Sequence, residues 1–337
     1  MRLHLAALAF ALGTSLAIAS PAPVERLQVG NRVTENVPEI PAELIERLGR
    51  YQNTRGAGFA GWLEDGGMLV TTRFAETSQA HRLRMPMGAR EQITYYPEPI
   101  NSVSTPSSGR GGFAFAKDVG GSEFWQIFHY DLATREARML TDGRSRNQGP
   151  AWSNDGQRIA YSTTRRNGRD TDVHITDLAG NSVPLVEREG AWYVAGWSPD
   201  DSQLLVSRYI SINESQPYLV DVATGAMQRL YDPERPVSYG GLAFARDGRG
   251  IYYTSDATGE FRELRYRDFA SGASRSLSAH IPWDVQGFTQ SSDGRHLAFA
   301  TNEDGISKVH VVDTRDGSEV RLPELPVGLI GLGEFSP

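Results

Sequence analysis

The sequence predicts an all-β protein, a β-propeller of four-stranded blades with six recognisable blades and the start of a seventh. Two observations support this fold class. Glycine occurs 35 times and aromatic side chains make up 9% of the 337 residues, a composition typical of short strands joined by tight turns. A turn motif also recurs along the chain, with short alternating strands between its copies. Four strands in each repeat of ~45 residues is the spacing of a propeller blade.

Residues 1–19 are predicted to form a secretory signal peptide. Arg2 gives the positive start, residues 5–12 form an apolar stretch too short to cross a bilayer, and small residues precede a cleavage site after Ala19. A retained membrane anchor is the alternative, but the chain has no second apolar stretch of the ~20 residues that a span requires. We therefore expect the mature chain to be periplasmic or secreted.

Residues 20–50 are expected to be an N-terminal extension with one short helix. Pro41 suits the first turn of a helix, and Gly49 is expected to end it. Three apolar residues share one face of this helix: Leu44, Ile45 and Leu48. The propeller is then expected to occupy residues 51–337.

The repeat is visible in two sets of aspartates that keep the same period. The first set lies in the turn motif, after an aromatic residue and a small residue in the clearest copies: Asp65, Asp155, Asp200, Asp247 and Asp293. The last four are spaced by 45, 47 and 46 residues, and the longer first gap leaves room for a degenerate copy near residues 108–109. The second set ends a strand before another turn: Asp131, Asp177, Asp221, Asp268 and Asp313. A functional carboxylate would not need a copy in every blade, so these aspartates are interpreted as turn formers.

Composition excludes several classes of function. The chain carries 34 basic and 41 acidic residues, for a net charge of −7, and no basic run that could follow a phosphate backbone, which argues against nucleic acid as a partner. The absence of cysteine excludes disulfides, thiolate metal sites and a cysteine nucleophile. The seven histidines are scattered without local pairing, so no metal site and no cofactor is predicted.

The repeats resemble the WD40-like propeller repeats shared by TolB-type periplasmic proteins and by the prolyl oligopeptidase family of serine peptidases. The segments at residues 73–83, 90–94 and 118–132 favour the peptidases, because they are similar to the opening blades of dipeptidyl-peptidase-like or acylaminoacyl-peptidase-like members. The resemblance covers about Pro41 to Pro337. It implies a propeller that covers a hydrolase active site and admits peptides while excluding folded proteins.

In that family the propeller is followed by an α/β-hydrolase domain whose Ser-Asp-His triad places the serine in a Gly-x-Ser-x-Gly elbow. This chain has no such pentapeptide, and Ser122, which follows two glycines, lacks the second flanking glycine. Residues 334–337 match the start of the turn motif at residues 196–199. We therefore expect the chain to stop inside a repeat, with the catalytic domain absent and no catalytic residue of its own.

Four residues are candidates for contact with a substrate. Tyr193 and Gln286 lie on strands that precede the turn motif and are expected to line the axial channel, although small residues on these strands are equally explained by crowding of the inner strands. The resemblance implies acidic propeller residues that hold a free amine in exopeptidases, and Glu187 and Glu189 are the nearest approach to such a pair. A solvated turn is the alternative reading, and exopeptidase and endopeptidase remain open.

Three functions are compatible with these observations. The first is the non-catalytic, substrate-gating propeller portion of an exported serine peptidase, with peptide substrate and a separate hydrolase domain as partners. The second is a stand-alone TolB-like propeller that binds or scaffolds other proteins in the periplasm. The third is a propeller with its own active site, which the channel-lining strands disfavour because they carry no cluster of carboxylates or imidazoles.

Overall fold

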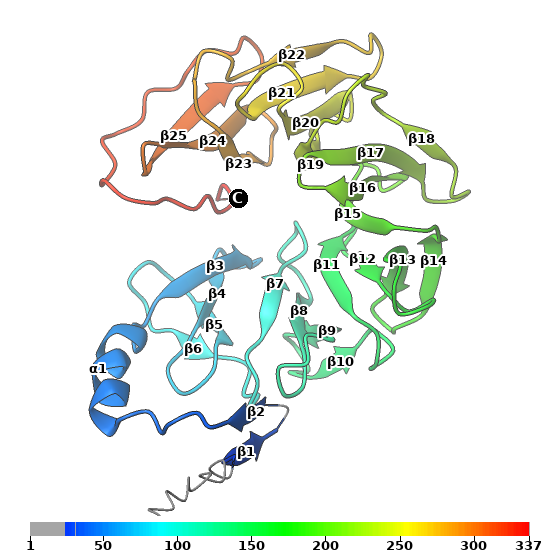
Figure 1. The fold of residues 1–337 in the computed structure, drawn as a ribbon. Coiled ribbons are helices and arrows are strands. Elements are labelled where there is room, and N and C mark those ends of the chain that lie inside the picture. Colours follow the sequence, from blue (N-terminus) through cyan, green and yellow to red (C-terminus); the bar gives the residue numbers. More distant parts are fainter. Residues whose placement is uncertain (1–23, 31, 337) are drawn as a thin grey trace, which may run out of the picture. The chain divides into compact units, whose positions relative to one another are not determined.

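A computed structural model of the chain describes residues 24–30 and 32–336 (Figure 1). The predicted signal peptide, residues 1–19, lies outside the described residues. The chain divides into two units, residues 1–54 and residues 55–337. No helix among the described residues has the length and apolar character needed to cross a membrane.

The first unit contains one hairpin and one helix. Strand β1 (Arg26–Val29) pairs antiparallel with β2 (Arg32–Glu35), and α1 spans Ala42–Gln52. Pro41 precedes the helix at its N-cap, as expected. The helix does not end at Gly49, because the Asn53 N–H donates to the Gly49 carbonyl oxygen and carries the helix one turn further.

The second unit contains six antiparallel sheets arranged around a common centre, which confirms the predicted propeller (Figure 1). Sheet 1 contains β3 (Ala57–Trp62), β4 (Met68–Thr72), β5 (Gln79–Leu83) and β6 (Glu91–Gln92). Sheet 2 contains β7 (Asn101–Ser104), β8 (Gly112–Lys117), β9 (Gln126–Asp131) and β10 (Ala137–Met139). Sheet 3 contains β11 (Asn147–Trp152), β12 (Arg158–Thr163), β13 (Asp172–Asp177) and β14 (Ser182–Val186).

The remaining sheets follow in the same order, each beginning with the strand nearest the centre. Sheet 4 contains β15 (Ala191–Trp197), β16 (Gln203–Ser211), β17 (Glu214–Asp221) and β18 (Met227–Arg229). Sheet 5 contains β19 (Tyr239–Phe244), β20 (Gly250–Ser255), β21 (Glu263–Asp268) and β22 (Ser274–Ser276). Sheet 6 has three strands, β23 (Val285–Gln290), β24 (His296–Glu303) and β25 (Ile306–Asp313).

The segment after β25 passes from sheet 6 toward sheet 1. An isolated bridge between Val312 and Glu319 marks the place of a fourth strand. Further on, the Ser307 N–H donates to the Gly328 carbonyl oxygen at 2.9 Å, and Gly333 lies against the ring of Phe59 on β3. Residues 321–336 form no strand, so the segment assigned by the repeat spacing to the start of a seventh blade is irregular where the structure describes it.

The repeated aspartates form turns. In sheets 3, 4 and 6 a serine hydroxyl donates to the aspartate two residues later, and Ser198 and Asp200 show this at 2.6 Å. The hydrogen bond from the Ser198 hydroxyl, together with those from Ser202, lowers the pKa of Asp200 to about 2. The following residue, Asp201, adopts a positive φ of 58° and accepts hydrogen bonds from the backbone N–H groups of Asn154 and Asp155 in the neighbouring turn. One turn therefore also joins sheets 3 and 4.

The core is divided among the interfaces between consecutive sheets. Alternate residues of a central strand face opposite neighbours. On β16, Leu204 and Val206 join the apolar cluster with sheet 3, whereas Leu205 joins the cluster with sheet 5. Five such clusters connect sheets 1 to 6 in sequence. None of the five clusters joins sheet 6 to sheet 1 within the described chain. On β24, the residues on the face toward sheet 1 are Ala298 and Ala300. We call the boundary between sheets 6 and 1 the seam.

The difference between a closed interface and the seam predicts the outcome of two matched substitutions. Leu204→Ala removes a fully buried side chain between sheets 3 and 4, and is expected to lower the free energy of unfolding by about 2–5 kcal/mol. Leu329→Ala, in the segment between sheets 6 and 1, removes a side chain that is 76% exposed and is expected to cost less than about 0.5 kcal/mol. Urea unfolding of both variants measures the two losses of stability. Equal losses would contradict the absence of an apolar cluster at the seam.

Candidate functional site

The four sequence-predicted site residues occupy two places in the ring. Glu187 and Glu189 are exposed in the connection between β14 and β15, and Tyr193 follows on β15, where it is half-buried and pairs with Ser207. Gln286 is exposed on β23 of sheet 6, at a bulge in its pairing with β24. The structure therefore brings the two glutamates and Tyr193 into one region and places Gln286 in another.

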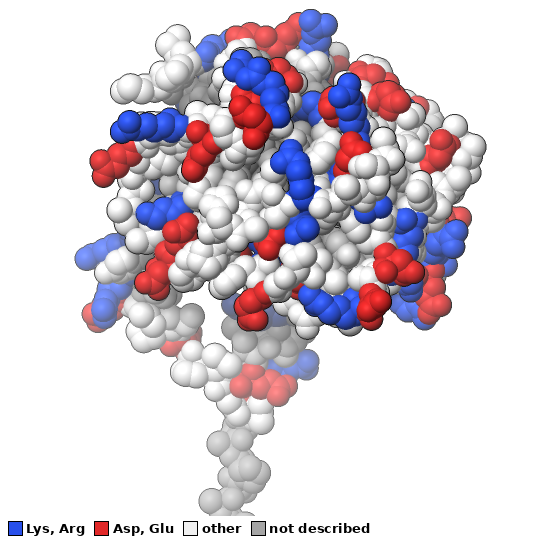
Figure 2. Space-filling model, turned by 90° about the horizontal axis from the view of Figure 1, so that it is seen from above, with Lys and Arg blue, Asp and Glu red and all other residues white. Residues whose placement is uncertain are grey.

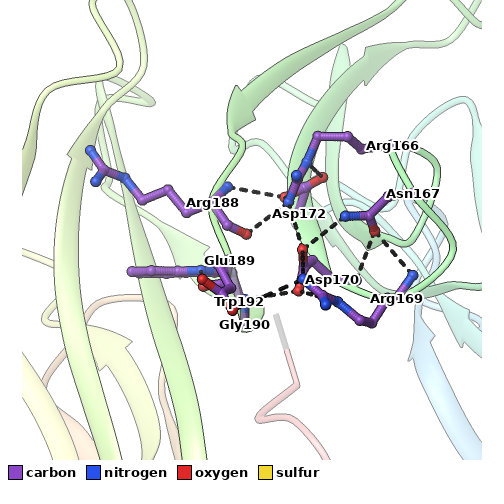
Figure 3. Close-up of polar contacts among 9 residues, drawn as sticks. All are labelled: Arg166, Asn167, Arg169, Asp170, Asp172, Arg188, Glu189, Gly190 and Trp192. Carbon is purple, nitrogen blue, oxygen red and sulfur yellow. Dashed lines mark hydrogen bonds and ion pairs between the residues drawn. The ribbon is translucent and has the colours of Figure 1, made fainter.

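The region around the two glutamates contains a network of buried carboxylates (Figure 3). Asp172, the first residue of β13, is completely buried and accepts two hydrogen bonds from the Arg166 guanidinium, at 2.8 Å and 3.1 Å. It also accepts one from the Arg188 backbone N–H at 3.2 Å. Arg166 in turn donates to the Arg188 carbonyl oxygen at 2.9 Å. The Arg188 guanidinium itself points away from both carboxylates of the network (Figure 3).

Asp170 is the second buried carboxylate. It accepts hydrogen bonds from the Asn167 amide at 2.8 Å, from the Arg169 guanidinium at 3.2 Å and from the Gly190 backbone N–H at 3.1 Å. These donors, led by Asn167, hold the pKa of Asp170 far below its ordinary value. Both carboxylates are engaged by several donors, so neither is a candidate for general acid or base chemistry.

The network joins two loops. The loop between β12 and β13 supplies Asp170, and the connection from β14 to β15 supplies Gly190. The Thr171 N–H donates to the Gly190 carbonyl oxygen, and the Trp192 N–H donates to the Thr171 carbonyl oxygen, both at 3.0 Å. Gly190 has a φ of 105°, which a residue with a Cβ rarely adopts. The entry of the chain into sheet 4 is therefore fixed by hydrogen bonds from sheet 3.

An aromatic pocket of about 480 Å³ lies beside this connection. It is lined by Arg188, Glu189, Trp192, Arg208, Tyr218 and Met227. The Trp192 and Tyr218 rings are 5.2 Å apart, and the Arg208 guanidinium lies 5.6 Å from the centre of the Trp192 ring. The Glu189 side chain is 85% exposed, 4.0 Å from Arg169. Tyr193 follows Trp192 directly, so its side chain points to the opposite face of sheet 4.

This pocket can bind but offers no nucleophile. Its aromatic rings suit a flat or apolar group, its arginines suit an anion, and Glu189 suits an amine. The sequence pattern pointed to Glu189 but missed Trp192, Arg208 and Tyr218, which come from three strands of sheet 4. It also missed Asp170 and Asp172, although the charged segment at residues 165–172 was a visible signal.

Two hydroxyl–histidine pairs elsewhere come close to catalytic geometry without completing it. His174 Nδ1 is 3.3 Å from Ser182 Oγ, but no carboxylate orients the ring, and Nε2 is buried without a hydrogen-bond partner. In sheet 6, His310 lies 3.4 Å from Thr301 Oγ1 and 3.1 Å from Glu319.

Thr301, however, is completely buried and donates its hydroxyl proton to Glu303. A substrate carbonyl could not reach this hydroxyl. Among the residues that the structure describes, no group of three or more histidines and carboxylates could hold a metal ion.

Comparisons with known proteins give three relationships. The family model described as the TolB β-propeller domain matches residues 113–324. YuxL, an uncharacterized peptidase of Bacillus subtilis (strain 168), is 28% identical over 190 residues, which are 55% of this chain and 27% of the peptidase. A Tol-Pal system protein TolB of Desulfosudis oleivorans is 26% identical over 146 residues, which are 43% of this chain and 32% of that protein.

The fold is also similar to a structure from a study of two prolyl endopeptidases. The TM-score is 0.66 at 16% identity, over 83% of this chain and 44% of the other. The matched region spans about a third or less of the length of the two curated relatives. These relationships confirm the resemblance to TolB-like and peptidase propellers.

The buried network predicts unequal effects from two carboxylate-to-amide substitutions in the same site. Asp172→Asn removes the closer of the two charge partners of the Arg166 guanidinium and leaves Asp170 at 3.3 Å as the other. It is expected to lower the free energy of unfolding by about 2 kcal/mol, less than for full burial because that guanidinium is partly exposed. Glu189→Gln replaces an exposed side chain and is expected to change the free energy of unfolding by less than about 0.5 kcal/mol. Chemical denaturation of the two variants compares them, and an equal loss would show that the network adds nothing to the stability.

Buried histidines predict a loss of stability below pH 6.5. Burial is the main cause that lowers the pKa of His174, and the positive charge of Arg165 lowers it further, against opposing effects of Glu187, Asp172 and Asp142. The unfolded chain then binds a proton that folded His174 does not bind, so acid favours unfolding, by at most about 1.4 kcal/mol per pH unit. His174→Phe is expected to reduce the slope of stability against pH between about 6.5 and 5.

The exposed His280 provides the control for this measurement, because His280→Gln should leave the slope unchanged. An unchanged slope in His174→Phe would show that His174 does not titrate on unfolding. His81 is also buried with a lowered pKa, so some acid sensitivity is expected to remain in either variant.

Proposed function

We propose a function for this chain, which belongs to the TolB β-propeller domain family: it is the non-catalytic, substrate-gating propeller portion of an exported serine peptidase. In this proposal, peptide bonds are hydrolysed in a separate α/β-hydrolase domain. The proposal rests on the similarity to the peptidase YuxL and to the structure from the prolyl endopeptidase study. The matched part covers 27% of YuxL and 44% of that structure. Most of each relative therefore lies outside the matched region, which leaves room for a catalytic domain.

The side chains of the ring support a gating role rather than a catalytic one. The carboxylates of the network between sheets 3 and 4 are occupied by arginines. No carboxylate orients the histidine beside the Ser182 hydroxyl, and the Thr301 hydroxyl beside His310 is buried and bonded to Glu303. Such a ring can select what passes without reacting with it.

An axial cavity of about 290 Å³ supports the same role. It is formed where turns of sheets 1, 2, 5 and 6 meet residues 334–335, and Arg246 and Glu334 both line it. A cavity of this size admits a peptide side chain or a short extended segment and excludes a folded domain.

The substrate contacts in this proposal are the residues that the sequence identified. Tyr193 and Gln286 belong to the innermost strands of sheets 4 and 6, where a peptide passing along the axis would meet them. Glu189, at the edge of the aromatic pocket, is the candidate for a substrate amine, with Glu187 beside it in the same connection. The exposure of Glu189 and its proximity to Arg169 make this a weak, salt-sensitive contact.

A stand-alone, TolB-like periplasmic propeller is the second candidate, favoured by the match to a Tol-Pal system protein and by the family model. The reading frame beyond the codon for Pro337 distinguishes the two. The peptidase proposal requires a Gly-x-Ser-x-Gly sequence within a following α/β pattern. A stop codon after one further blade would favour the scaffold.

The proposal also predicts that the propeller alone is inert toward serine-directed reagents. The chain is expected to show no labelling by a fluorophosphonate probe, because no serine of the described residues is activated by an oriented histidine. Gel fluorescence and intact mass measure the labelling, with an active serine hydrolase as the positive control. Stoichiometric modification of any serine in this chain would contradict the proposal and favour a propeller with its own active site.

A further inference from the structure

A groove of about 690 Å³ lies between sheets 5 and 6, at the end of the ring where the turn motifs lie, and five arginines line it. They come from the turns after β19, β23 and β25 and from the outer strand β22: Arg246, Arg249, Arg275, Arg295 and Arg315. Figure 2 shows acidic and basic side chains interspersed over the face in view. We call this cavity the arginine groove.

The acidic residues of the arginine groove are already occupied. Asp313 forms ion pairs with Arg315 at 2.7 Å and with Arg295 at 3.4 Å. Asp293 accepts hydrogen bonds from the Ser291 hydroxyl and the Arg295 backbone N–H within its own turn. Asp247 accepts one from the Arg249 backbone N–H. Two carboxylates, Asp247 and Asp293, line the groove and Asp313 pairs with two of its arginines, against five guanidinium groups, so the groove has an excess of positive charge.

Two of the arginines form no ion pair with any described carboxylate. Arg275 lies with its guanidinium 5.5 Å from the centre of the Tyr266 ring, and Tyr266 lies 5.1 Å from the buried Tyr252. These three residues form one cross-strand row on β20, β21 and β22, facing sheet 6. The other, Arg246, lines both this groove and the axial cavity. Two guanidinium groups are therefore available to an external anion, one of them over an aromatic floor.

The positions of these arginines indicate the shape of that anion. Arg246 follows the innermost strand of sheet 5 and Arg275 lies on its outermost strand, so their backbones are three strand spacings, or about 14 Å, apart. A single phosphate or carboxylate contacts both guanidinium groups only if both side chains extend toward each other. An extended polypeptide advances about 3.3 Å per residue, so a segment of about four or five residues spans this distance with carboxylates near both ends.

We propose that the arginine groove is a docking site for an acidic, extended polypeptide segment that lies between sheets 5 and 6 with its carboxylates on Arg246 and Arg275. The tyrosine row supplies an apolar floor for the backbone and side chains of that segment. The proposal concerns a protein partner and does not depend on the assignment of the chain to a peptidase.

Fluorescence anisotropy of labelled hexaglutamate with the whole chain tests this proposal, at a low ionic strength of about 20 mM, where exposed charges are least screened. Hexaglutamine of the same length provides the neutral comparison. Binding of hexaglutamate alone is expected, with an affinity that falls as salt is added. The double variant Arg246→Gln/Arg275→Gln is expected to weaken binding about tenfold.

A matched variant controls for the loss of two positive charges. Arg138→Gln/Arg144→Gln removes two exposed arginines outside the groove, on β10 and in the connection that follows it, and is expected to weaken binding less than about twofold. Circular dichroism confirms that both double variants keep the fold. Equal weakening by the two double variants would overturn the proposal, and so would the absence of hexaglutamate binding.

Inorganic phosphate distinguishes a small-anion site from a peptide groove. At matched ionic strength, phosphate is expected to displace hexaglutamate no better than chloride does, because in this proposal each arginine holds a separate carboxylate of one extended segment. Specific displacement by phosphate would show that the groove holds a single small anion, and would overturn the docking of an extended segment.

Discussion

Every sheet of this ring has two apolar faces, and each face must be covered by a neighbour. The alternation of side chains along the second strand of each sheet meets this requirement, as on β16, where Leu204 faces sheet 3 and Leu205 faces sheet 5. Five apolar clusters follow from it and hold the six sheets in order. Sheet 6 and sheet 1 have no such cluster between them among the described residues. The faces of these two sheets at the seam therefore depend for their cover on the irregular segment at residues 321–336 or on a further partner.

Much of the architecture follows from local chemistry that the sequence displays. The aspartates of both sets accept hydrogen bonds from residues two or three positions away, so their period is the period of the blades, and residue types alone were enough to predict them. The end of α1 was predicted wrongly because Gly49 keeps a helical conformation. The Asp170–Asp172 network could not be predicted, because its partners lie in two loops whose approach depends on the packing of sheets 3 and 4.

The candidate sites show why function was harder to predict than fold. Sequence position suggested that Tyr193 and Gln286 share a channel, and they do share the innermost layer of strands. The aromatic pocket beside Glu189, however, is assembled from side chains of β15, β16, β17 and β18, whose spacing in sequence shows no motif. The arginine groove likewise combines turns of two sheets. Both are candidate binding surfaces, which accords with the proposed function of a ring that selects polypeptides and leaves bond cleavage to another domain.

Hydrogen–deuterium exchange along the chain tests most directly the central claim that stability resides in the interfaces between consecutive sheets. The account predicts slow exchange for amides of the central strands β8, β12, β16 and β20, each of which contributes side chains to two apolar clusters. It predicts faster exchange for β4 and β24, the corresponding strands of the two sheets that border the seam. Equal protection of all six strands would contradict it, because the ring would then be closed by contacts as strong as the five apolar clusters.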